Sequence, residues 1–185
     1  MLYRPRILPS SMAKAGSTFF IRSRLTMAAA GTENEIEIPL GAFLNPLADQ
    51  ALVIHNIEVQ VCDSSQPEKG PYTADSVLNF GWNLCTSSQL GNFDTLYLDD
   101  NSVVASGRMS TFLDPDDAFF ESTVKDMMPQ SWTAGYTVAS ESLYLIGHAD
   151  DTSANGTYEL SIVMECSQIK LGKNEAINLA LSQTQ

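Results

Sequence analysis

Apolar and polar residues alternate with a period of two through most of the chain, and this alternation limits the possible folds more than any other feature of the sequence. The clearest example is the segment 51–62, where one side carries Val53, His55, Ile57, Val59 and Val61 and the other side carries Asn56, Glu58 and Gln60. Successive side chains of a β-strand point to opposite faces, so this segment is predicted to be a half-buried strand. Helical periodicity is nearly absent before residue 174, which indicates an all-β chain.

Further strands are predicted at short intervals, over residues 19–27, 33–40, 76–86, 95–98, 102–109, 142–148 and 157–171. The pair Asn155-Gly156 is typical of a tight hairpin, so the strands at 142–148 and 157–171 are expected to pair with each other. Pro115 and the acids around it favour one short helical turn within residues 114–124. Asn174 is suited to cap a short helix over residues 175–181.

These segments together predict an antiparallel β-sandwich of jelly-roll type, with an extended N-terminal arm and a short C-terminal helix. The chain has 185 residues, of which 44% are hydrophobic, and this is enough to bury one stable core. We therefore expect a basic arm over residues 1–32 and a single jelly-roll domain over residues 33–185. No apolar stretch approaches the roughly 18 residues that a membrane-spanning helix needs.

Charge is distributed unevenly along the sequence. Residues 1–32 hold five of the ten basic residues and no acid, whereas Glu33 is the first of 22 acids. The arm thus carries a charge of +5, and the remainder, with five bases against 22 acids, carries −17. We expect the arm to be retained rather than removed as a transit peptide, and no apolar stretch follows its charges as in a secretory signal. Such asymmetry is typical of an end that contacts a polyanion or an acidic neighbour.

Catalytic motifs are missing from the sequence, and we expect no catalytic residue, no cofactor and no enzymatic activity. Cys62, Cys85 and Cys166 lie in apolar strand patterns at wide spacing, so they are interpreted as buried, reduced thiols. His55 is grouped with the valines of its strand and is expected to be a core histidine. His148 lies beside the predicted hairpin, where it is expected to support the turn.

Two kinds of ligand remain open at this stage. Calcium could bind the acidic clusters at Asp99-Asp100 or at Asp114, Asp116 and Asp117, although neither cluster matches a calcium-loop pattern and we assign no metal ligand. Trp82, Trp132 and Tyr136 could stack on a sugar if they were exposed. Trp82 is expected to be buried in the sandwich instead.

The order of the segments resembles a known family. A basic, acid-free arm precedes the long strand "ALVIHNIEVQVCD", the strand "VLNFGWNL", the late pair "LYLIGHADDTSANGTYELSIVMEC" and the closing helix "KNEAINLAL". This arrangement resembles a single jelly-roll major capsid protein of an archaeal or bacterial virus. The resemblance implies a virion shell protein present in many copies, whose partners are copies of itself and other shell subunits. It leaves open whether the arm contacts nucleic acid, an inner membrane or neighbouring subunits, and it implies no small-molecule substrate.

The residues expected to serve assembly lie in the arm: Arg4, Arg6, Lys14, Phe19, Phe20, Ile21, Arg22, Arg24 and Leu25. Two alternatives to a capsid subunit remain. One is an extracellular filament or surface subunit, in which residues 19–27 of one copy complete the sheet of the next copy. The other is a jelly-roll carbohydrate-binding module.

Overall fold

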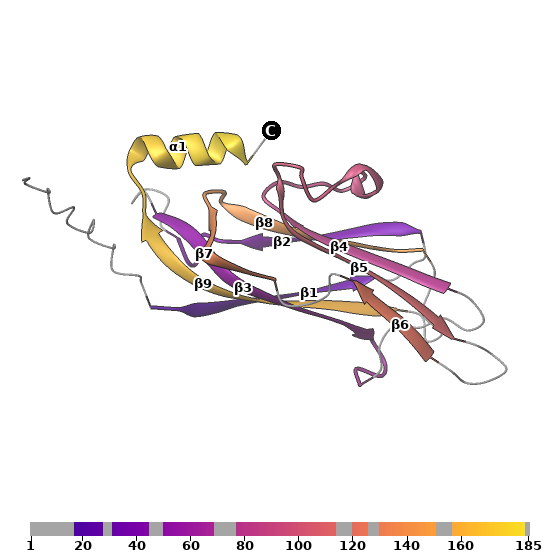
Figure 1. Ribbon diagram of the computed structural model, residues 1–185. Helices are drawn as coiled ribbons and strands as arrows, with labels where there is room; N and C mark the ends of the chain where they lie inside the picture. Colours follow the sequence, from indigo (N-terminus) through magenta and orange to yellow (C-terminus); the bar gives the residue numbers. More distant parts are fainter. Residues whose placement is uncertain are drawn as a thin grey trace, which may run out of the picture.

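The computed structural model describes residues 17–27, 31–44, 50–68, 77–113, 120–125, 130–150 and 157–183. This part of the chain forms two antiparallel sheets, a short 3-10 turn at Phe93–Thr95 and one terminal helix (Figure 1). The elements are β1 (Phe19–Met27), β2 (Thr32–Pro39), β3 (Gln50–Asp63), β4 (Val77–Cys85), β5 (Val103–Leu113), β6 (Phe120–Lys125), β7 (Gln130–Val138), β8 (Ser142–Ala149), β9 (Tyr158–Lys170) and α1 (Lys173–Ser182). In the described residues no helix is long and apolar enough to cross a bilayer.

The strand order defines a jelly roll. The four-stranded sheet has the order β1-β9-β3-β7, and the five-stranded sheet has the order β2-β8-β4-β5-β6. The antiparallel pairs are therefore nested along the chain: β1 with β9, β2 with β8, β3 with β7, and β4 with β5. This nesting is the topology of a jelly-roll sandwich, with β6 as an added edge strand. The predicted fold class is confirmed.

The core lies between the two sheets, and residues from β1 to β5 and from β7 to β9 supply it. Trp82 of β4 is fully buried, as predicted. On β9 the alternate residues Tyr158, Leu160, Ile162, Met164 and Cys166 are all buried, as expected for a half-buried strand over residues 157–171. The two sheets pack their apolar faces together, which leaves the other face of each sheet to solvent or to loops.

A β-bulge at His55 changes the faces of β3. The register of β3 against both of its neighbours shifts between Ile54 and Asn56. Leu52 and Ile54 therefore face the core before the bulge, and Ile57 faces it afterwards. The prediction that His55 is a core residue on the face of Ile57 was wrong, because one extra residue moves the preceding side chains to the opposite face. The His55 ring is only partly buried, and its Nε2 lies 2.8 Å from the Ser167 hydroxyl.

The predicted pairing of the two late strands was also wrong. β8 pairs with β2 and β4 in the five-stranded sheet, whereas β9 pairs with β1 and β3 in the other sheet. The chain thus crosses between the layers after β8, and the Asn155-Gly156 pair lies outside the described residues. Each of the two strands has a neighbour on both sides within its own sheet.

Three other segments differ from the prediction. The expected strand over residues 95–98 is absent, because the 3-10 turn occupies its start. β6 occupies the end of the range 114–124, in which one short helical turn was expected, but Pro115 and the acids around it lie outside the described residues. β7 was not predicted at all. Its residues mix polar and aromatic side chains and include Gly135 at a φ of 77°, so it lacks the clean alternation of a half-buried strand.

Candidate assembly surface

The predicted arm reaches into the sandwich itself. β1 pairs with β9 along its whole length, from Phe19 opposite Cys166 to Met27 opposite Tyr158. Its inward side chains Ile21, Leu25 and Met27 belong to the core. The predicted boundary at residue 32 therefore falls after the first strand of the sandwich, and Ile21 and Leu25 are buried core residues of this same chain.

The outward side chains of β1 form a small basic strip at the edge of the four-stranded sheet. Phe20 is 52% exposed, and the Arg22 guanidinium lies 5.4 Å from the centre of its ring. Arg24 is also exposed on this face. Arg4, Arg6 and Lys14 lie outside the described residues. Of the nine predicted assembly residues, Ile21 and Leu25 are buried in the core and Phe19 is partly buried against it. Phe20, Arg22 and Arg24 are exposed, and the other three lie outside the described residues.

The segment Thr86–Ser102, here termed the capping loop, folds back over the outer face of the five-stranded sheet. Two acids of β2 hold it there. The Glu33 carboxylate accepts hydrogen bonds from the amides of Gly91 (2.5 Å) and Phe93 (3.1 Å), and Glu35 accepts one from the amide of Gln89 (2.8 Å). These acids alternate as a solvent-facing row in the sequence, and their role as loop anchors was not foreseen.

Phe93 fixes the middle of the capping loop. Its ring is 7% exposed, stacks on His148 with the ring centres 5.5 Å apart, and lies under the Arg108 guanidinium at 4.7 Å. It sits directly over Gly81 of β4, where an added Cβ would come within 2.7 Å of the ring. Because Gly81 has no side chain, the Phe93 ring can pack directly against the backbone of β4. His148 supports this loop, whereas a role beside a hairpin was expected.

Replacing Phe93 with Ala is expected to lower the free energy of unfolding by about 3 kcal/mol, the low end for loss of a buried aromatic ring. Urea unfolding followed by Trp fluorescence measures the loss. The matched control is Leu90→Ala in the same loop, because Leu90 is 58% exposed and its truncation should change stability by less than about 0.5 kcal/mol. Equal losses for the two variants would show that Phe93 does not anchor the loop.

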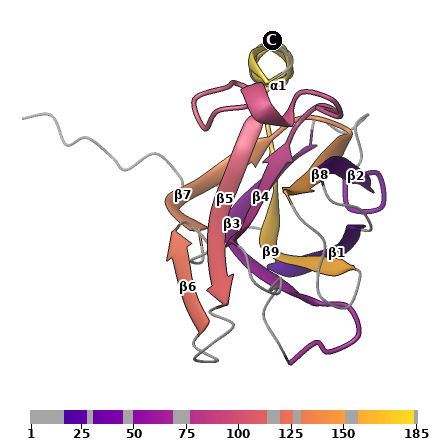
Figure 2. The same ribbon diagram turned by 90° about the vertical axis from the view of Figure 1, so that its right-hand side faces the viewer.

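The capping loop and α1 present large apolar side chains to solvent. Tyr97 is 70% exposed and Leu98 is 67% exposed, although the loop that carries them is firmly anchored. Figures 1 and 2 place the capping loop and α1 on the same side of the molecule, above the five-stranded sheet. We call the exposed apolar residues of these two elements the apolar face; they are Leu90, Tyr97, Leu98, Ile177 and Leu181. Large apolar side chains exposed on one side of a molecule make that side a candidate interaction site.

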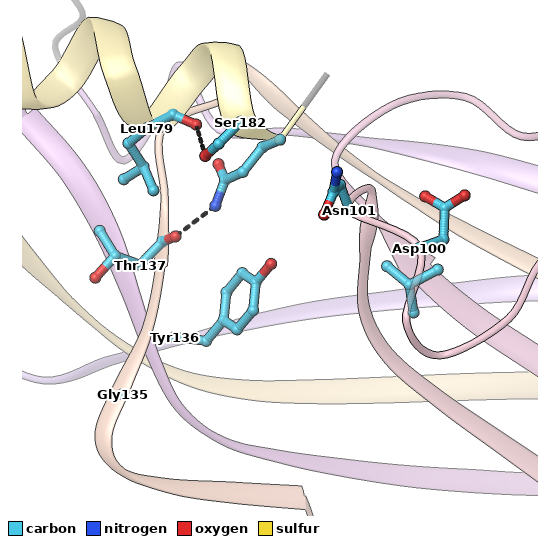
Figure 3. Close-up of a pocket in the computed structure, with 9 residues that line it drawn as sticks. Asp100, Asn101, Gly135, Tyr136, Thr137, Leu179 and Ser182 are labelled. Atoms are coloured by element: carbon cyan, nitrogen blue, oxygen red, sulfur yellow. Dashed lines mark hydrogen bonds between the residues drawn. The ribbon is translucent and has the colours of Figure 1, made fainter. Parts of the chain in front are cut away.

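A cavity of about 430 Å³ separates α1 from the capping loop, and β7 forms its floor. Tyr136 projects into it from β7, with Asn101 of the loop on one side and Leu179 of α1 on another (Figure 3). The last turn of α1 is fixed to the body through buried Gln183. Its side-chain amide donates to the Thr137 carbonyl at 2.7 Å, which attaches this end of the helix to β7.

The position of Tyr136 in this cavity affects the pKa of its side chain. Burial raises the pKa of its hydroxyl, and a hydrogen bond with Gln183 partly opposes that shift. The ring packs against the core together with Trp132, whose ring centre lies 5.7 Å away at a tilt of 55°. With Trp82 fully buried, the three aromatic residues do not form a joint exposed platform for a sugar.

Ionisable groups elsewhere serve structure. The three cysteines are free and buried, as predicted. Among the described residues, no group of three or more His, Cys, Asp or Glu side chains is placed to hold a metal ion. The Asp100 carboxylate accepts hydrogen bonds from the amide and hydroxyl of Ser102, as in an Asx turn. The second acidic cluster, at Asp114, Asp116 and Asp117, lies outside the described residues, so calcium binding there stays untested.

Comparisons with known proteins found no matching family model and no matching curated protein. Among solved structures, a chain of Desmodium yellow mottle tymovirus is similar over 92% of this chain and 98% of its own length, with 11% identity and a TM-score of 0.31. VP1 of Merkel cell polyomavirus, from an unassembled pentamer, is similar over 85% of this chain and 99% of its own, with 7% identity and a TM-score of 0.38. Both neighbours are viral proteins. Because these TM-scores are low, the fold assignment rests on the strand order alone.

Proposed function

We propose that this protein is a structural subunit that self-assembles into a shell, as the capsid subunit of a virus. The observation that carries the proposal is the apolar face, which an anchored loop and a fixed helix hold open to solvent. A jelly-roll fold hosts many functions, so the surface has to decide between them. This surface offers contact area rather than a catalytic arrangement.

The anchoring of the capping loop favours binding. Glu33 and Glu35 hold its backbone, and Phe93 holds its centre, so Tyr97 and Leu98 are already ordered before any partner arrives. Preorganised side chains lose little conformational entropy when a partner covers them. Tyrosine in particular is enriched at the centres of protein interfaces. Covering the sheet does not require Tyr97 and Leu98 to be exposed, whereas binding a partner does.

The charge distribution is consistent with assembly among copies. The portion after residue 32 carries −17, which opposes close packing of bodies unless salt or a cation screens it. The +5 segment that precedes it supplies the opposite charge within the same chain. Each copy therefore contributes both a positively charged segment and a negatively charged body to a shell.

The alternatives receive less support. In strand donation, residues 19–27 would leave their own sheet, yet here β1 pairs in full with β9 of the same chain. In a sugar-binding module, the three predicted aromatic residues would share an exposed face, yet Trp82 is buried. Location in a virion, an archaeal or bacterial host, and contact of the arm with genome or membrane remain parts of the proposal that follow from the sequence resemblance.

The test is a double variant, Tyr97→Ser with Leu98→Ser. We expect it to keep its unfolding midpoint, because both side chains are more than two-thirds exposed, and to lose at least tenfold in association strength. Multi-angle light scattering measures the assembled mass, and electron microscopy distinguishes closed shells, filaments and monomers. The conservative pair Tyr97→Phe with Leu98→Met should assemble normally. Unchanged assembly of the serine variant would refute the proposed role of the apolar face, and a monomeric wild-type protein would refute self-assembly.

A further inference from the structure

We propose that the cavity between α1 and the capping loop binds the N-terminal segment of a second copy, residues 1–16. This inference rests on the proposed self-assembly and names the contact that would link one subunit to the next. It commits to a segment of this chain whose composition matches the cavity in both charge and apolarity.

The cavity is lined by apolar and polar side chains and by one carboxylate, that of Asp100. Tyr136 and Leu179 supply ring and aliphatic surface, and the buried Val103 also lines it. Asp100 lines the rim, and Asp99 next to it is exposed. A cavity of about 430 Å³ falls within the usual range for a binding pocket and has room for a few side chains of a peptide.

Charge complementarity selects the N-terminal segment as the occupant. The capping loop contains three acids, Asp94, Asp99 and Asp100, and no basic residue. Residues 1–16 contain Arg4, Arg6 and Lys14 and no acid. Opposite charges on two surfaces steer their encounter and fix the register of binding. This segment is the part of the acid-free stretch 1–32 that precedes the described residues.

The apolar residues of the segment match the cavity as well. Leu2, Tyr3, Ile7 and Leu8 are interspersed with the basic residues, so a peptide that places its cations at the rim also brings aliphatic and aromatic groups to Tyr136 and Leu179. A purely basic segment would neutralise the rim but would leave the interior unfilled. Residues 1–16 therefore contain both the basic and the apolar side chains that the cavity would bind.

Chain geometry allows the segment to reach a neighbouring copy. Phe19, Cys166, Ile54 and Tyr136 lie in one row across the four-stranded sheet, with β1 and β7 at opposite edges. Three strand spacings, about 14 Å, therefore separate the start of β1 from the cavity floor. Sixteen residues span up to roughly 50 Å when extended, several times that distance. The described chain enters the sandwich at the edge opposite the cavity, and the 16 residues before it are long enough for a cavity of the same copy or of an adjoining one.

Disulfide cross-linking between two separate variants tests this. One full-length chain carries Ile7→Cys and the other, with a different tag, carries Asn101→Cys at the exposed rim. The native thiols are buried and should not compete. After mixing under assembly conditions and mild oxidation, we expect a disulfide between the two tagged chains at a yield at least tenfold above that of a control pair. The control replaces the rim cysteine with Glu68→Cys, which is exposed beyond the far end of β3.

A second arm of the experiment tests the charge contribution. Asp99→Asn together with Asp100→Asn, added to the Asn101→Cys chain, should lower the cross-linking yield roughly two- to fivefold for each charge removed. Asn at position 100 still provides a side-chain oxygen for the Ser102 hydrogen bonds, so the turn should survive. The matched control, Glu58→Gln with Glu68→Gln, removes the same charge elsewhere and should leave the yield unchanged.

The outcomes separate the inference from the function on which it rests. If particles form but the Ile7–Asn101 pair cross-links no better than the control pair, the inference is overturned and the shell function stands. Cross-linking only within a single chain that carries both cysteines would also overturn it, because the segment would then occupy its own cavity. If the wild-type chain never assembles, the proposed function fails and the inference fails with it.

Discussion

Deletion of residues 1–31 is expected to prevent folding, whereas deletion of residues 1–16 should leave the sandwich intact. The longer deletion removes β1, whose side chains Ile21, Leu25 and Met27 are at most 6% exposed. Loss of a large buried aliphatic side chain costs about 2–5 kcal/mol, and three such losses are comparable to the whole stability of a typical domain, about 5–15 kcal/mol. The edge of β9 would also lose its hydrogen-bonded neighbour.

Circular dichroism and urea unfolding distinguish the two truncations. The 1–16 deletion should unfold cooperatively at nearly the wild-type midpoint, and the 1–31 deletion should show no cooperative transition. The shorter deletion also removes the proposed occupant of the cavity, so it should fold as a monomer. A folded protein lacking residues 1–31 would show that the sheet closes without β1, and would return strand donation to consideration.

Alkaline conditions are expected to destabilise the protein through two buried thiols. Burial raises the pKa of both Cys85 and Cys166 to about 12, from 9.0 in an exposed thiol. A thiol with a raised pKa binds its proton more tightly in the folded chain, so its contribution to stability is complete below pH 9 and is lost as the pH rises towards 12. A shift of this size corresponds to about 4 kcal/mol for each thiol. The protein should therefore unfold within this window.

Urea unfolding at pH 8 and pH 11 measures this effect. The control is the variant Cys85→Ala with Cys166→Ala, which lacks both thiols and should lose much less stability between these two values. The difference between the proteins isolates the thiols from other groups that titrate at high pH, Tyr136 included. A thiol reagent at pH 8 should modify none of the three cysteines until urea unfolds the chain. Equal pH dependence of the two proteins would contradict this account.

Residue alternation in the sequence was sufficient to predict the fold class and much of the core. The inward residues of β4 and β9, the burial of Trp82 and the inert cysteines all follow from period two, because a strand with one apolar face must bury that face. The short terminal helix was predicted from the helical spacing of its apolar residues, but the predicted cap was wrong, because α1 begins at Lys173 and Asn174 lies inside it. These are local properties, and local sequence specifies them.

Strand partners could not be predicted in the same way. Alternation shows which face of a strand is apolar but does not show which strand lies beside it, so the Asn155-Gly156 signal suggested a hairpin where β8 and β9 in fact belong to different sheets. The bulge at His55 could not be predicted, because residues 51–54 are all apolar. Such a segment does not show which of its side chains face the core.

The candidate surface depended most on tertiary structure. Glu33 and Glu35 alternate as solvent-facing acids in the sequence, and only the fold brings them to the amides of a loop more than 50 residues away. Gly81 and Phe93 are likewise distant in the sequence, and only the fold shows that the missing side chain of Gly81 leaves space for the Phe93 ring. Sequence alone determined the two-layered sandwich, the acidic body and the basic start of the chain. The folded structure decided which apolar residues stayed outside, because burial of a side chain depends on packing between distant segments and not on the residues beside it.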